Sequence, residues 1–307
     1  MTDMLFNKDN NGSRELYELT GIFYASTRYE SVASEVDHAV SVVSDLVGAD
    51  VMKKAEDEYA KETPDDAHFL SLVRMSVACL AVCNFSKANL VSHEDTGRKI
   101  KTDDNEKVPF EWMIDRDDRE QLERYYRAMD SLYSYLAESW PEWSRNPLKT
   151  GCVVRTLDQL EAVFPVDRSY YCFHMLLPLI MSVQRRKLVK LVGADGISAA
   201  LENPDAAMSE LLREYAVLGA LKTAVQRWSL DVFPLSVARR FAPSYQGNRE
   251  SKTATTDEID WYLLKLSTQM EDAEAEIVEM MSGGRNPYED FPLLPENDPR
   301  KKYFTTQ

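Results

Sequence analysis

The chain has 307 residues, of which 44% are hydrophobic and 28% charged, and it carries a formal net charge of −15 with a pI near 4.8. This length allows two domains of ordinary size, and the composition is typical of a globular protein with a hydrophobic core. The net negative charge argues against a protein that binds nucleic acid tightly, because such binding requires a basic face. It is compatible with an acidic wall past which DNA slides without binding.

Neither an export signal nor a membrane span is expected. The first residues, MTDMLFNKDNNGSRELYEL, are charged and polar where a signal peptide needs an apolar stretch. The longest apolar run, near Val77–Phe85, is interrupted by Asn84 and is far shorter than the roughly 20 residues of a membrane-spanning helix. The chain is therefore expected to be made in the cytoplasm without a membrane segment.

The pentapeptide LVGAD occurs twice, at 46–50 and at 191–195. Four positions at helical spacing precede each copy, and the two sets correspond at an offset of 145 residues. Three of the four corresponding pairs are apolar in both copies. The positions are Val32, Val36, Ala39 and Val43 before the first copy, and Leu177, Met181, Gln184 and Leu188 before the second. Gly48 and Gly193 are predicted to end these helices in the left-handed cap conformation.

Two further helices follow each copy. FLSLVRMSVACLAVCNF and MSELLREYAVLGALKTAVQRW align at an offset of 140, which pairs Val77 with Val217, Leu80 with Ala220 and Leu90 with Leu230. Residues 117–139 and 256–281 then predict two long helices, each with a narrow apolar stripe. The stripes correspond at an offset of 141: Leu122, Tyr125, Met129, Leu132 and Leu136, then Leu263, Leu266, Met270, Ala273 and Ile277, extending to Ile259 and Met280.

These recurrences indicate an internal duplication in a mainly α-helical protein. Each unit is predicted to read helix, turn, helix, hairpin, long helix, with the hairpins in the irregular stretches that precede the long helices. The predicted organisation is an N-terminal arm (1–20), a first helical unit (21–147), a second helical unit (148–283) and an extended tail (284–307). The tail should run extended because its prolines exclude a helix.

No motif for catalysis, a cofactor or a metal is present. The four histidines His38, His68, His93 and His174 form no zinc-binding pattern, and glycine-rich nucleotide motifs and the G-x-S-x-G motif are absent. Asp95-Thr96-Gly97 resembles an aspartic protease turn, but its polar flanks favour a solvated hairpin turn. Asp115, Asp117 and Asp118 lack the glycine of a calcium loop and suit a helix N-terminus.

The cysteines and basic clusters also have structural interpretations. Cys79 and Cys83 share one face of an apolar helix, and with Cys152 and Cys172 they indicate a reducing compartment and core thiols. The clusters Gln184-Arg185-Arg186-Lys187, Arg239-Arg240 and Arg300-Lys301-Lys302 are small and scattered. The first is expected near the end of its helix, where cations favour the dipole. We therefore expect no enzyme, no cofactor and no metal.

The succession of these elements resembles a family of uncharacterised phage and prophage proteins of Bacteroidetes, a domain of unknown function encoded within structural gene clusters. The resemblance rests on the order of the LVGAD turn, the alanine-rich helix, VPFEW, the long helix and PEW, followed by a second series of such elements. It therefore covers most of the chain. The family has no established catalytic residues to carry over.

By analogy with its gene neighbours, the family resembles head–tail connector (adaptor) proteins. The resemblance implies a virion structural protein in the neck, in contact with portal and tail proteins within a homo-oligomeric ring through which DNA passes without specific binding. The candidate interface residues are the apolar ones of the two arms: Leu5, Phe6, Phe291, Leu293, Leu294, Tyr303 and Phe304. The alternative is a non-virion assembly helper or chaperone of head completion.

Overall fold

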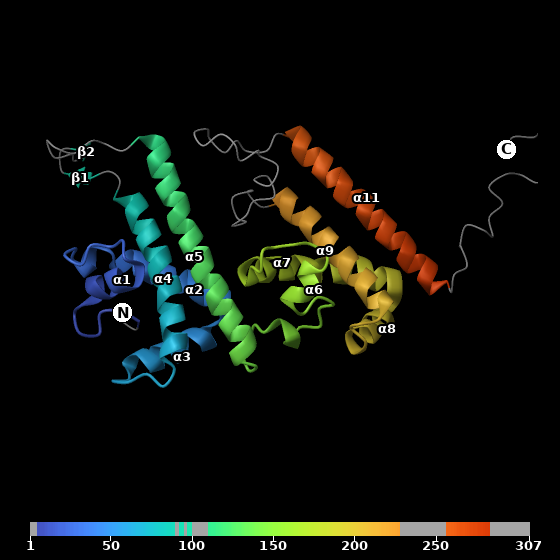
Figure 1. The fold of residues 1–307 in the computed structure, drawn as a ribbon, viewed down its shortest axis with the longest axis horizontal. Coiled ribbons are helices and arrows are strands. Elements are labelled where there is room, and N and C mark those ends of the chain that lie inside the picture. The colour runs from blue at the N-terminus through green and yellow to red at the C-terminus, as the bar shows by residue number, and fades with distance from the viewer. Residues whose placement is uncertain (1–4, 90–91, 95–96, 100–109, 228–255, 283–307) are drawn as a thin grey trace, which may run out of the picture. The chain divides into compact units, whose positions relative to one another are not determined.

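The structure, a computed structural model, describes residues 5–89, 92–94, 97–99, 110–227 and 256–282. These residues are mainly helical and fall into two compact units (Figure 1). The first unit includes Met1–Thr150 and Asp167–His174, and the second includes Gly151–Val166 and Met175–Leu230. The predicted division at 147 and 148 lies near this boundary, but Asp167–His174, which was assigned to the second unit, belongs to the first.

Helix α4 lies at the centre of the first unit and contacts α1, α2, α3 and α5. Asp66 caps its N-terminus by accepting a hydrogen bond from the amide of Phe69 at 3.0 Å. Val73, Val77 and Ala81 along its length are fully buried. The elements of this unit are α1 (Gly12–Thr20), η1 (Tyr29–Ser31), α2 (Ala33–Val47), α3 (Ala49–Ala60), α4 (Ala67–Ala88), β1 (Ser92–Glu94), β2 (Gly97–Lys99), α5 (Glu111–Ser139) and η2 (Pro147–Lys149).

Among the described helices, α4 is the one whose length and composition would allow it to cross a membrane, with a mean hydropathy of 1.6 over a window that is 56% buried. Its surroundings explain this apolar character, because helices pack on several of its sides. Arg74, within the helix, forms an ion pair with Glu15 of α1. Helix α4 is thus built as the core helix of its unit.

Helices α9 and α11 form the main contact of the second unit (Figure 1). They run antiparallel, because Tyr215 donates to Glu274 at 3.2 Å and Lys222, further along α9, donates to Ser267 at 2.8 Å. A methyl group at Gly219 would lie 3.0 Å from the side chain of Val183 and 3.2 Å from that of Met270, so glycine leaves room for these two side chains against α9. The elements are α6 (Leu157–Glu161), α7 (Tyr170–Val183, which begins in the first unit), the π-helical turn η3 (Gln184–Leu188), α8 (Val189–Glu202), α9 (Ala207–Arg227) and α11 (Thr256–Met281).

Both LVGAD glycines break a helix, as predicted, but in a different conformation. Gly48 has φ 105° and ψ 150°, and Gly193 has φ 75° and ψ 173°. These values lie in the extended region at positive φ rather than in the left-handed cap, and this region is accessible essentially to glycine alone. The two identical pentapeptides therefore adopt the same kind of break.

The predicted apolar stripes of the long helices are matched by their burial. Tyr125, Leu132 and Leu136 of α5 are buried, and so are Leu266, Ala273 and Ile277 at the corresponding positions of α11. Leu122 and Leu263, which open the stripes, are both half-buried, whereas Met129 is buried and its counterpart Met270 half-buried. The predicted extension to Met280 is wrong, because this side chain is 44% exposed.

Several element boundaries differ from the sequence predictions. Helix α5 begins at Glu111, so Asp115, Asp117 and Asp118 lie within the helix rather than at its N-terminus. Helix α3 lies between the first LVGAD turn and α4, where the predicted order of helix, turn, helix has no additional helix, and its buried Val51, Met52 and Ala55 form an apolar face. Residues 1–20 are not a free arm, since α1 packs on α4.

The hairpin predicted before the first long helix is confirmed by β1 and β2, which pair antiparallel with Glu94 opposite Gly97. The second predicted hairpin, Leu90, Leu230, Asp95, Thr96, Arg239-Arg240 and the tail 284–307 with Arg300-Lys301-Lys302 lie outside the described residues.

We expect Leu132→Asp and Ala273→Asp each to destabilise the protein, because both side chains are at most 4% exposed. A carboxylate at Leu132 should lower the free energy of unfolding by about 3–5 kcal/mol. Denaturant unfolding followed by circular dichroism measures this. Leu264→Asp on the exposed face of α11 is the matched control, with an expected change within about 0.5 kcal/mol. A silent substitution at either buried site would refute the correspondence of the two stripes.

Candidate functional site

The interface assignment of Leu5 and Phe6 is corrected by the structure. Their side chains are 1% and 0% exposed, so they belong to the core of the first unit. Arg74 of α4 donates to the Leu5 carbonyl at 2.9 Å, and its guanidinium lies 5.0 Å from the centroid of the Phe6 ring. The sequence prediction placed both residues in an N-terminal arm that could reach neighbouring subunits. The other candidate interface residues, Phe291, Leu293, Leu294, Tyr303 and Phe304, lie outside the described residues.

Glu15 is the centre of the network that fixes this N-terminal segment. Its carboxylate pairs with Arg74 and accepts hydrogen bonds from the Asn7 amide at 3.0 Å and from the Tyr59 hydroxyl at 3.0 Å. The side chains of Glu15 and Arg74 are each 18% exposed, so the pair is shielded from water. Lys8 also donates to the carbonyls at the end of α3: Tyr59, Ala60 and Lys61. The N-terminal segment is therefore packed against the first unit as part of its structure.

The first LVGAD turn receives side-chain hydrogen bonds from α5 and from the segment that follows it. The break at Gly48 ends α2, and the carbonyls of Leu46 and Val47 then accept side-chain donors. The indole of Trp143 donates to Val47 at 2.6 Å, and the hydroxyl of Tyr133 donates to Leu46 at 3.0 Å. These donors satisfy acceptors that the helix end leaves without partners.

Ser144 and Arg145 complete the closure of this turn. The amide and hydroxyl of Ser144 donate to the two oxygens of Asp50 at 3.0 and 2.7 Å, and Arg145 makes a long contact of 3.5 Å to the Leu46 carbonyl. Partial burial acts to raise the pKa of Asp50, but the bonds from Ser144 outweigh it and the pKa is lowered. The segment after α5 thereby covers the turn between α2 and α3.

Aromatic rings join Asp167–His174 to α5. His174 stacks on Tyr133 with centroids 4.2 Å apart and an angle of 11° between the rings, and Trp143 lies 5.0 Å from it. Tyr126 stacks on Tyr171 at 5.3 Å. Within the described residues, the buried Nε2 of His174 and the buried hydroxyl of Tyr125 have no hydrogen-bond partner. These rings supply packing area rather than a reactive arrangement.

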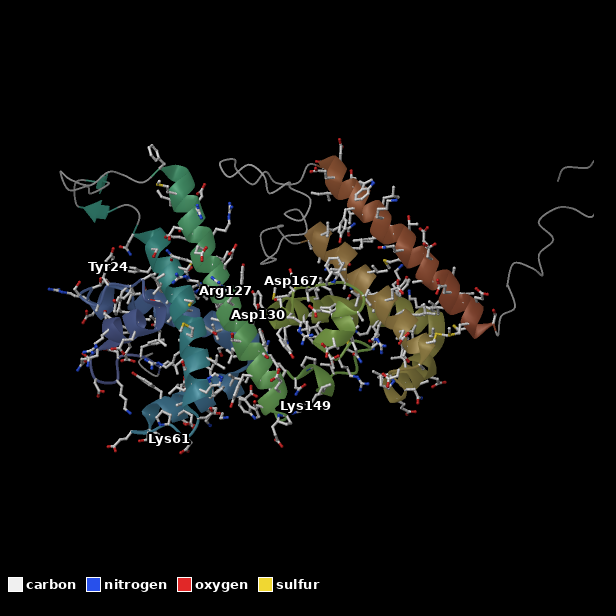
Figure 2. All side chains as sticks on the ribbon, in the orientation of Figure 1. Tyr24, Lys61, Arg127, Asp130, Lys149 and Asp167 are labelled. Atoms are coloured by element: carbon white, nitrogen blue, oxygen red, sulfur yellow. The ribbon has the colours of Figure 1, made fainter. Side chains whose placement is uncertain are left out.

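Asp130 anchors the same segment from α5 (Figure 2). Its carboxylate accepts from the Ser169 hydroxyl at 2.9 Å and from the Tyr171 amide at 2.8 Å. Burial raises the pKa of Asp130, and these two bonds offset only part of that effect. The carboxylate serves as a cap for the start of α7, so its role is structural.

The thiols are placed as the core interpretation predicted. Cys83, Cys152 and Cys172 are buried and Cys79 is half-buried, and all four are free. Burial raises the pKa of Cys79 and Cys152 to about 11 and that of Cys172 to about 12. Thiols with raised pKa values are poor nucleophiles at neutral pH. Within the described ranges, no three histidine, cysteine or acidic side chains are grouped to hold a metal ion.

The basic cluster at Gln184 is located differently from the prediction. It forms the π-helical turn η3 between α7 and α8, not a helix end. Gln184 turns inward, where it accepts from the Val153 amide at 2.8 Å and donates to the Gly151 carbonyl at 2.6 Å. The cationic side chains that follow it are exposed: Arg185, Arg186, Lys187 and Lys190. The π turn and the start of α8 therefore present four cations on the second unit.

Comparison with known proteins adds no relative. No protein-family model, curated protein or solved structure matches the chain.

We expect His174 to make the first unit less stable in mild acid. Burial lowers the pKa of His174 to about 3, whereas in the unfolded chain it titrates near its ordinary 6.5. Between these values only the unfolded chain takes up the proton, so the free energy of unfolding should fall by about 1.4 kcal/mol per pH unit.

The measurement is urea unfolding at pH 7.0, 5.5 and 4.5 for the wild type and His174→Phe, where the difference between the two isolates the titration of this residue. The exposed His38 supplies the control His38→Phe. Equal pH dependence in wild type and His174→Phe would contradict the assignment.

Proposed function

We propose that the chain is a non-enzymatic structural subunit of a phage or prophage particle: a head–tail connector that bridges portal and tail through protein–protein contacts. The observation that carries this proposal is an exposed apolar face on α11. Trp261 is 54% exposed and Leu264, on the same side of the helix, is 64% exposed. Large apolar side chains that share an exposed face mark contacts with other proteins.

The corresponding face of α5 is charged. At the offset of 141 residues, Trp261 and Leu264 correspond to Glu120 and Glu123. Two helices with the same buried stripe thus differ on the outward face, where packing within the unit imposes no requirement. Apolar side chains at such positions favour a role outside the unit.

The occupant of this face is proposed to be a neighbouring copy in a homo-oligomeric ring. A ring is built from head-to-tail contacts, in which one surface of a subunit meets a different surface of the next. The four cations of η3 and α8 lie on a chain with a net charge of −15, so they are complementary to the acidic surface of another copy. The same acidic balance suits a neck channel through which DNA passes without specific binding.

The proposal includes a tandem duplication of the helical unit. It is supported by the two positive-φ glycines of LVGAD and by the matched burial along α5 and α11. The extended C-terminal arm, with Phe291, Leu293, Leu294, Tyr303 and Phe304 as interface residues, is proposed as the contact to portal or tail proteins.

Quantitative mass spectrometry of gradient-purified particles from the source strain tests the virion role. The expected result is a copy number equal to the portal's or a small multiple of it. Absence from particles despite abundance in the lysate would reject the connector and favour the assembly helper.

The α11 face is tested with the double variant Trp261→Glu, Leu264→Glu. We expect unchanged helix content but at least a tenfold loss of incorporation into particles, because the two carboxylates replace the apolar area that this face contributes to the contact. Leu148→Glu is the matched control, since Leu148 is 57% exposed in the first unit. Normal incorporation of the double variant would show that this face is not an interface.

A further inference from the structure

The turn after α1 presents two large apolar side chains to solvent. Tyr24 is 77% exposed and Ile22 is 40% exposed, whereas Phe23 between them is buried (Figure 2). Phe23 packs edge-on against Phe85 of α4, with the ring centroids 5.4 Å apart. Because the inward side chain is anchored in the core, its two neighbours are held in a fixed outward direction. Tyr24 is therefore a preorganised apolar contact point on the first unit.

The backbone where this turn begins is also held in place. Gly21 has a left-handed conformation with φ 68°, and its amide donates to the Tyr17 carbonyl at 2.7 Å. Arg124 of α5 donates to the Thr20 carbonyl at 3.2 Å. Residues 21–28, which we call the Tyr24 turn, are thus fixed by contacts with both α4 and α5.

The position of the Tyr24 turn in the proposed duplication indicates what it can contact. Ile22–Tyr29 stands 145 residues before Asp167–His174, the offset that separates the two LVGAD copies. Asp167–His174 docks on α5 through Tyr171, which stacks on Tyr126 at 5.3 Å and whose amide donates to Asp130 at 2.8 Å. The segment that precedes the second LVGAD helix therefore has the outer side of a long helix as its docking surface.

The docked segment runs in the same direction as α5. Tyr171 stacks on Tyr126, and His174, three residues later in the segment, stacks on Tyr133, seven residues later in the helix. A Tyr24 turn laid on the other long helix, α11, in the same direction would bring its start to the first half of α11 and its end to the second half.

The outer face of α11 is open where the docked face of α5 is covered. At the offset of 141 residues, Glu271 of α11 corresponds to Asp130, and Glu271 is exposed whereas Asp130 is half-buried. The exposed Leu264 lies seven residues before Glu271, on the same side of the helix and about 10 Å away along its axis. The outer face of α11 therefore offers an apolar contact followed by a carboxylate.

The charges of the two surfaces are complementary. Helix α11 carries eight acidic residues and one lysine. The Tyr24 turn contains a single charged residue, Arg28, which is exposed. On a chain with a net charge of −15, an apolar turn whose one charge is positive can approach the acidic helix of another copy without repulsion.

We propose that the Tyr24 turn of one copy docks on the outer face of α11 of the next copy. In this arrangement Tyr24 lies against Trp261 and Leu264, and Arg28 pairs with Glu271. The contact joins the first unit of one copy to the second unit of another, so it is head-to-tail, as a ring requires. This inference rests on the homo-oligomer proposed above, and it names the surface that meets the α11 face.

Disulfide trapping between two full-length variants tests the contact. Tyr24→Cys is mixed with Leu264→Cys, so that a 24–264 disulfide can form only between chains. After mild oxidation, peptide mapping should show this disulfide forming roughly tenfold faster than the 148–264 disulfide in a mixture of Leu148→Cys with Leu264→Cys. Leu148 is the matched control because it is 57% exposed on the same unit as Tyr24.

Charge variants supply a second measurement. Arg28→Glu in the Tyr24→Cys chain should slow trapping several-fold, because a carboxylate then faces Glu271. Glu271→Arg in the Leu264→Cys chain should restore the rate, because it reverses both signs of the pair. Lys53→Glu makes the same change of charge at an exposed lysine of α3 and should leave the rate nearly unchanged.

Equal trapping rates in the two mixtures would overturn the docking. In the double variant Tyr24→Cys, Leu264→Cys, a 24–264 disulfide that forms at the same rate on dilution would assign the contact to a single chain and would also overturn it. Because the trapping uses purified protein without particles, this inference and the virion role can fail separately. Trapping without incorporation into particles would reject the connector, and incorporation without trapping would reject the docking.

Discussion

The break at Gly48 is the constraint on which the first unit depends. A positive φ with extended ψ is accessible essentially to glycine, and it stops α2 where the carbonyl of Val47 is buried and that of Leu46 part-buried. Those carbonyls require donors, and the donors come from Tyr133 on α5 and from Trp143 in the segment after it. The backbone conformation of Gly48 therefore requires that α5 place Tyr133, and the segment after it Trp143, beside this turn.

The same reasoning explains why Asp167–His174 belongs to the first unit. Tyr133, which donates to the turn, also stacks on His174, and Trp143 lies against that imidazole. Asp130, one helical turn before Tyr133, holds the backbone at Tyr171. The groups that close the turn are thus the groups that bind the segment, and removal of either would leave buried polar atoms without partners.

The second unit has the same glycine break and the same buried stripe as the first, but its exposed side chains differ. Gly193 repeats the break and α11 repeats the buried stripe, but the turn is exposed and the outer face of the long helix is apolar. Under the proposed duplication, the inward positions are constrained by packing and stay similar. The outward positions are free to change, and there Trp261, Leu264 and the cations of η3 distinguish the second copy from the first.

Much of the helical content follows from the sequence. The limits of α11 and the stripes of both long helices are determined by apolar spacing, and the breaks at Gly48 and Gly193 by the requirements of glycine. The sequence also indicated core thiols and the first hairpin. By contrast, Asp115, Asp117 and Asp118 were misplaced because α5 begins upstream, in residues without a strong periodic pattern.

Tertiary structure alone decided the environment of several residues. Leu5 and Phe6 follow no periodic pattern, so their burial depends on Arg74 and Glu15, which lie far apart in sequence. The assignment of Asp167–His174 and the π turn at Gln184 likewise depend on Asp130, Tyr133 and the carbonyl of Gly151. Local propensity and periodicity determine the helices, because their hydrogen bonds are local. The partners of a buried polar or aromatic group are determined only when distant segments come together.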